Sequence, residues 1–144
     1  MKYNYQRWML KTALFYLIVG SLLGLVLFFS PHYETFAWAS AWRTTHVHLI
    51  LVGSVIQTIM GVALWMFPRK KDPPHFTTEA EGTILYFVLN AGVILRSIGE
   101  PLQYLSRAFF HLALWGMVLQ ILALIYFAFL IYGRIRAPTA LSPK

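Results

Sequence analysis

Residues 44–68 read TTHVHLILVGSVIQTIMGVALWMFP and contain no Lys, Arg, Asp or Glu, which makes them the clearest indication of the fold. A helix of that length crosses the hydrocarbon core of a bilayer, which needs about 20 apolar residues. The stretch opens with two histidines one residue apart. An α-helix turns by about 100° per residue, so His46 and His48 lie on nearly opposite sides of the helix and cannot both bind a single ion.

The histidine pair predicts buried binding sites. Histidine is rare inside membrane helices unless it faces the protein interior, a cavity or a cofactor, because an unpaired imidazole is costly there. Two histidines on opposite faces therefore predict two buried cofactor sites. The chain has no cysteine, which excludes iron–sulfur clusters, thiolate-bound copper or zinc, and the covalent attachment of a c-type haem. Side-chain ligation and packing must hold any haem.

The composition predicts an integral membrane protein with almost no soluble part, because 58% of the 144 residues are hydrophobic. We predict one all-α domain over residues 1–144, an antiparallel bundle of four transmembrane helices. Their expected positions are about residues 10–30, 44–68, 82–100 and 107–133. The third helix is long enough only if it continues through Arg96 toward Glu100, and we expect it to end before Pro101.

Positive charges predict how the bundle lies in the membrane. If the four helices alternate in direction, nine of the 12 Lys and Arg residues fall on the side of the termini, and three fall on the other side. The positive-inside rule then places both termini in the cytoplasm of a bacterial or archaeal cell. The net charge of +7 is accounted for by short cytoplasmic segments near anionic lipid headgroups. No nucleic-acid partner is expected.

The string HVHLILVGSVIQTIMGVALWMFPR, residues 46–69, resembles the tenth helix of haem–copper oxidase subunit I, especially that of the cbb3-type oxidases. The resemblance rests on an HxHL start, two glycines and an aromatic end at Pro-Arg, which here are His46, His48, Leu49, Gly53, Gly61, Phe67, Pro68 and Arg69. It covers one predicted helix of four, roughly a sixth of the chain. In that family the first histidine of the pair ligates a high-spin haem and the second a low-spin haem.

The resemblance also implies an assembly. The family's subunit has twelve helices in three groups of four, and the HxH pair stands on the second helix of its group, as it does in this chain. A single four-helix unit could rebuild that ring as a homotrimer. His46 of one chain and His48 of the next would then ligate a haem b at each subunit interface. Copper is not expected, because the family's copper site needs an adjacent histidine pair and this chain has none.

Three arginines are candidate partners of the haem propionates, which need cations near the membrane surface. Arg43, Arg96 and Arg107 are the positive residues on the predicted outer side. Arg96 lies inside the third predicted helix and can pair either with a propionate or with Glu100, one helical turn away. Arg43 and Arg107 can equally be interfacial residues whose charged ends reach water.

His111 and Gly53 are the remaining candidate site residues. His111 lies near the start of the fourth predicted helix, at the expected depth of the HxH pair. A single bundle could therefore hold the haem between His111 and one of the paired histidines, or His111 could form only a hydrogen bond. Gly53 is seven positions after His46 and close to the same face, where it leaves room either for a haem ring or for a packed helix.

These features predict a membrane haem b protein that transfers single electrons, because a haem with both axial positions filled cannot bind a gas. A quinol or a periplasmic electron-transfer protein would be its redox partner. The pattern is compatible with an oxidoreductase and does not require one. The alternatives are a five-coordinate haem protein that binds O2 or NO, and an accessory or structural subunit of a respiratory oxidase. A transporter is disfavoured, because the predicted helices are not broken and lack the usual coupling groups.

Overall fold

The computed structural model describes residues 4–67, 79–132 and 134–135, and the described chain is all-helical. Four helical spans are long and apolar enough to cross a membrane, which confirms the predicted all-helical fold with four such helices. They are α1 (Asn4–Phe29), a composite span over Glu34–Met66, α4 (Glu79–Leu102) and α5 (Arg107–Tyr132). The composite span consists of η1 (Glu34–Trp42), α2 (Arg43–His48), η2 (Leu49–Ile56) and α3 (Gln57–Met66).

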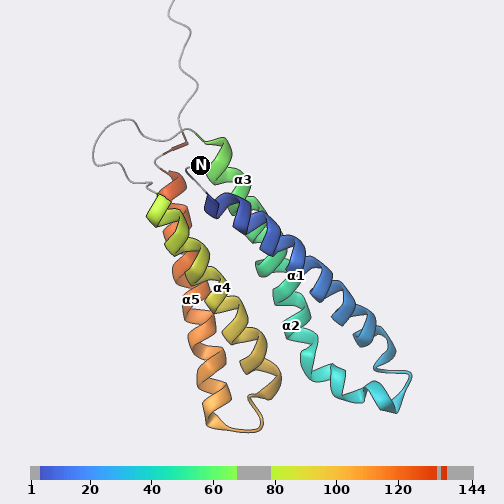
Figure 1. Ribbon diagram of the computed structural model, residues 1–144. Helices are drawn as coiled ribbons and strands as arrows, with labels where there is room; N and C mark the ends of the chain where they lie inside the picture. Colours follow the sequence, from blue (N-terminus) through green and yellow to red (C-terminus); the bar gives the residue numbers. More distant parts are fainter. Residues whose placement is uncertain (1–3, 68–78, 133, 136–144) are drawn as a thin grey trace, which may run out of the picture.

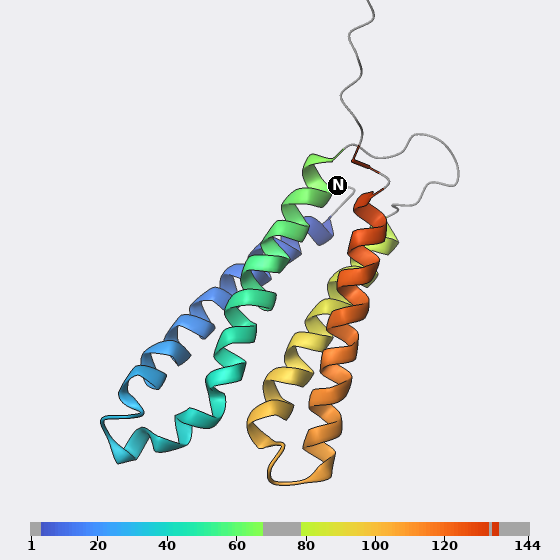
Figure 2. The same cartoon turned by 180° about the vertical axis from the view of Figure 1, so that it is seen from behind.

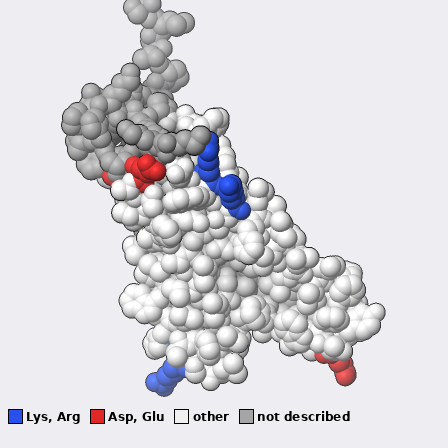
Figure 3. Space-filling model, in the orientation of Figure 1, with Lys and Arg blue, Asp and Glu red and all other residues white. Residues whose placement is uncertain are grey.

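The four spans form two antiparallel pairs. α1 lies beside the composite span, and α4 lies beside α5 (Figure 1). The view from behind shows the same two pairs (Figure 2): at the end opposite the N-terminus α1 swings away from α4 and α5, whereas α2 stays against α4. The start of α1 and the end of α5 therefore lie at the same end of the bundle. On the face shown in Figure 3, charged side chains lie toward the two ends, and the band between them has none.

Several helix boundaries differ from the predicted ones. α1 begins at Asn4 instead of near residue 10, so the exposed Arg7 and Lys11 are part of the helix. Long basic side chains can extend from a helix end to water, so they do not stop a membrane helix early. The composite span begins at Glu34 because residues 34–42 form a 3-10 helix that continues directly into α2.

α4 also extends beyond its predicted end at residue 100. It ends at Leu102, and Pro101 lies inside its last turn. A proline there lacks only the N–H that would have bonded to the carbonyl four residues earlier, and the helix has no further turn to lose. The loop that follows is short and turns the chain back into α5, which makes the two helices antiparallel neighbours.

The composite span changes its winding directly after the histidines. η2 is a π-helix, a wider form that is rare in proteins and frequent near functional sites. Gly53 lies in the middle of η2 and is buried. A Cβ atom at Gly53 would lie 2.8 Å from Cδ2 of Tyr16 on α1. The space beside Gly53 is therefore filled by an aromatic ring of the same chain.

Close helix contacts depend on glycine in both pairs. In α1, a Cβ atom at Gly20 would lie 2.7 Å from Cδ1 of Ile50, so a larger residue would require the Ile50 side chain to shift. In the other pair, a Cβ atom at Gly116 of α5 would lie 2.5 Å from the backbone nitrogen of Arg96. The contact at Gly116 places the segment of α4 around Arg96 directly against α5.

Candidate functional site

His46 and His48 lie on α2 and point to two different neighbouring helices. Nδ1 of His46 lies 2.8 Å from the carbonyl oxygen of Gly20 on α1. Nδ1 of His48 lies 3.2 Å from Oε2 of Glu100 on α4, and 2.9 Å from the carbonyl oxygen of Thr44, one turn earlier in its own helix. The two imidazoles thus diverge, as helix geometry predicts for positions two residues apart.

The hydrogen-bond partners fix which ring nitrogen carries the proton. A backbone carbonyl can only accept, so Nδ1 of each histidine must be the donor. In the neutral imidazole the lone pair is then on Nε2. Within the described part of the chain, Nε2 of neither His46 nor His48 has a hydrogen-bond partner. Metal-bound histidines in proteins show this arrangement, with the distal N–H held by a carbonyl or carboxylate and the other nitrogen turned to the metal.

The ring of His46 rests on a glycine of α1. A Cβ atom at Gly24 would lie 2.7 Å from Cε1 of His46 and 3.2 Å from its Nδ1. Gly20, whose carbonyl accepts the hydrogen bond, is one turn earlier on the same face of α1. Gly24 therefore leaves room for this imidazole, and the carbonyl group of Gly20 holds it by a hydrogen bond.

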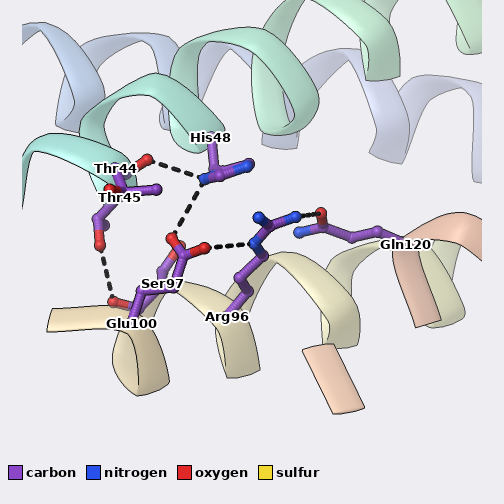
Figure 4. Close-up of polar contacts among 7 residues, drawn as sticks. All are labelled: Thr44, Thr45, His48, Arg96, Ser97, Glu100 and Gln120. Atoms are coloured by element: carbon purple, nitrogen blue, oxygen red, sulfur yellow. Dashed lines mark hydrogen bonds and ion pairs between the residues drawn. The ribbon is translucent and has the colours of Figure 1, made fainter. Parts of the chain in front are cut away.

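The other histidine belongs to a chain of polar contacts that crosses three helices (Figure 4). Oε1 of Glu100 accepts a hydrogen bond from Nε of Arg96 at 2.6 Å. Nη1 of Arg96 in turn donates to Oε1 of Gln120 on α5 at 3.2 Å. The side chains of His48, Glu100 and Arg96 are only 15%, 12% and 21% exposed, so these contacts are largely shielded from solvent. Of the two roles weighed for Arg96, the structure shows the ion pair with Glu100.

Two pockets lie close to the histidine-bearing helix. One has a volume of about 190 Å³ and adjoins the polar chain, with Thr44, Arg96 and Glu100 on one side and apolar side chains of α5 on the other. The second has a volume of about 310 Å³ and lies between α1, α2 and α4. Neither pocket is lined by His46 or His48. Neither of these two pockets therefore brings the two imidazoles together inside one chain.

The other predicted site residues stand apart from the pair. His111 is exposed on α5, with its ring centroid 5.6 Å from that of Phe110. α2 and α5 are not in contact, so His111 does not lie beside the HxH pair within one chain. Arg43 and Arg107 are both exposed, and among the described residues neither has an ion-pair partner.

Glu100, Gln120 and Gly24 are site residues that sequence reasoning did not find. For Glu100 the sequence predicts only a pair with Arg96; its expected depth near the histidines was the available signal for contact with one of them. Gln120 is a polar residue inside the fourth span, and such residues commonly form hydrogen bonds between membrane helices without any further role. Gly24 is part of the string GSLLG, whose small-xxx-small spacing was the available signal for a close helix partner.

Comparisons with protein-family models, with curated proteins and with solved structures gave no match to this chain. The resemblance to haem–copper oxidases therefore rests on residues 46–69 alone, of which residues 68 and 69 lie outside the described part of the chain.

Proposed function

We propose that this chain is a multi-pass membrane protein that binds haem b through His46 and His48 and transfers electrons. One observation carries the proposal. Both imidazoles on α2 have Nδ1–H engaged by an oxygen atom, and both keep the lone pair of Nε2 for another partner. Neither Nε2 belongs to the buried side-chain atoms that lack a partner in the described chain, so both are accessible at its surface, where an iron held by a second chain could reach them.

The distribution of apolar side chains supports a membrane location. Large apolar side chains are exposed on all four spans; examples are Phe15 at 61%, Ile59 at 56%, Phe87 at 59% and Phe129 at 68%. Such a surface is a liability in water and suits contact with lipid tails. With the excess of positive residues on the side of the termini, we place both termini in the cytoplasm of a bacterial or archaeal cell.

The residues present fit a haem held between chains. His46 is directed to α1 and His48 to α4, and α5, which carries His111, is not in contact with α2. In the proposal, His46 of one chain and His48 of the next ligate one haem in a closed homotrimer, as the resemblance to the twelve-helix subunit implies. Arg43 and Arg107, which are exposed, would pair with the propionates. When bound, a haem with two histidine ligands supplies one-electron chemistry, with a quinol or a periplasmic electron-transfer protein as partner.

The test is an absorption spectrum of the protein purified in detergent from haem-replete cells, oxidised and then reduced with dithionite, with and without carbon monoxide. A b-type spectrum that carbon monoxide does not change supports the proposal, because both axial positions are then filled. A response to carbon monoxide would instead indicate an open iron and a gas-binding protein. A protein without haem would contradict the proposal and leave the accessory or structural subunit.

A further inference from the structure

We propose that Glu100 and Arg96 set the redox potential of the haem ligated by His48, and that they do so in opposite directions. The inference rests on the proposed haem binding. Neither residue would touch the iron. Glu100 is a positioning residue that acts through the imidazole of His48, and Arg96 acts through Glu100.

Glu100 places a negative charge beside the imidazole of His48. The carbonyl oxygen of Thr44, at 2.9 Å, already holds the proton on Nδ1 of His48. The carboxylate oxygen Oε2 of Glu100 lies 3.2 Å from the same nitrogen and accepts no hydrogen bond from any described residue, so its effect on His48 is that of a nearby negative charge. A carboxylate beside the distal N–H makes an imidazole a more basic ligand. It therefore favours ferric haem, which carries one more positive charge than ferrous haem, and lowers the potential.

Arg96 counters this charge from the opposite side of the carboxylate. Its Nε lies 2.6 Å from Oε1 of Glu100, whereas His48 lies beside Oε2. The guanidinium is itself held by Gln120 on α5. Because all of these side chains are mostly shielded from solvent, their charges act on one another through a medium less polar than water. Removing Arg96 would leave the carboxylate uncompensated, and removing Glu100 would leave the guanidinium uncompensated.

The experiment is a spectroelectrochemical titration of the haem, in which the only reaction is one-electron reduction of ferric to ferrous haem by the added mediator and reductant. We compare the wild type with Glu100→Gln, Arg96→Gln and the double variant. Glu100→Gln should raise the potential and Arg96→Gln should lower it. The expected size is about a tenfold change in the ratio of oxidised to reduced haem at a fixed potential, which is about 59 mV for one electron. The double variant should lie near the wild type.

Glu34→Gln is the matched control. It removes an exposed carboxylate from η1, an element that lies at the same end of the bundle as the end of α4 (Figure 1), and should leave the potential unchanged. Shifts of the two test variants in the same direction, or no larger than in the control, would overturn the inference while the haem proposal stands. A wild type without haem would instead overturn the proposed function, so the two failures are distinguishable.

One further variant, Arg96→Lys, is compared with Arg96→Gln and covers the case in which Glu100→Gln fails to assemble. Arg96→Lys keeps the positive charge beside Glu100, and Arg96→Gln removes it. A potential that falls in Arg96→Gln and stays near the wild type in Arg96→Lys supports the inference. Equal shifts in both variants would show that Arg96 acts by shape alone and would overturn it.

Discussion

Thr45 on α2 donates a hydrogen bond to the backbone carbonyl of Ser97 on α4, with 3.2 Å between the oxygen atoms. In a regular helix this carbonyl would accept from the N–H of residue 101, but that residue is Pro101 and has none. The hydroxyl group of Thr45 therefore replaces a missing helical hydrogen bond. The contact also links α2 to α4, and so one helix pair to the other, at the residue that directly precedes His46.

Replacing Thr45 should therefore destabilise the fold. Thr45→Val keeps the branched shape of the 2% exposed side chain and removes the donor, which leaves the carbonyl oxygen of Ser97 without it. We expect a loss of about 1 kcal/mol in the free energy of unfolding, as for hydrogen bonds between membrane helices. Reversible unfolding in mixed micelles measures it. Thr44→Val is the matched control, because Thr44 is exposed and contributes its backbone carbonyl; equal losses in both variants would contradict the assignment.

Gly24→Ala should reduce haem binding through His46. The new methyl group would meet the imidazole at 2.7 Å, so the ring must shift away from the anchoring carbonyl of Gly20. Loss of an outer contact of a metal ligand commonly lowers affinity by about 10-fold or more. The measurement is the haem content per chain over a series of haem concentrations. Ser21→Ala, at an exposed position in the same helix, should bind as the wild type does; a similar decrease in both would argue against a specific role of Gly24.

His111→Ala distinguishes ligation between chains from ligation inside one chain. Because His111 is exposed and α2 is not in contact with α5, the variant should keep its haem and its indifference to carbon monoxide. His46→Ala and His48→Ala should each lose the six-coordinate spectrum. If His111→Ala opened the iron to carbon monoxide, His111 would be a ligand and the proposed pairing of His46 with His48 would be wrong.

Much of the fold could be predicted from the sequence, because helices long and apolar enough to cross a bilayer follow a simple rule of charge and length. Runs without charged residues located the spans, and the 3.6-residue period of the helix gave the divergence of His46 and His48. Arg96 obscured the third span in the sequence. The structure explains it, since its charge is paired with Glu100 inside the bundle.

The contacts of the candidate site could not be predicted in the same way. His48 meets Glu100 only because the two helix pairs pack together, and no local pattern relates residues so far apart in the sequence. The π-helical winding of η2 is likewise not encoded by a known local signal, and it accompanies the burial of Gly53 against Tyr16. The sequence allowed Gly53 two roles, and tertiary packing within the chain fills the adjacent space with the tyrosine ring.

The most direct measurement for the central claim is the haem content of trimers assembled from two different variants. His46→Ala and His48→Ala chains are co-expressed with different affinity tags, and assemblies that carry both tags are isolated. A closed mixed trimer has one interface in which an intact His46 faces an intact His48, so it should bind about a third of the wild-type haem, with a spectrum that carbon monoxide does not alter. Each variant alone should bind none in this form. Mixed assemblies without haem, or full haem binding by either variant alone, would contradict ligation of the haem between neighbouring chains.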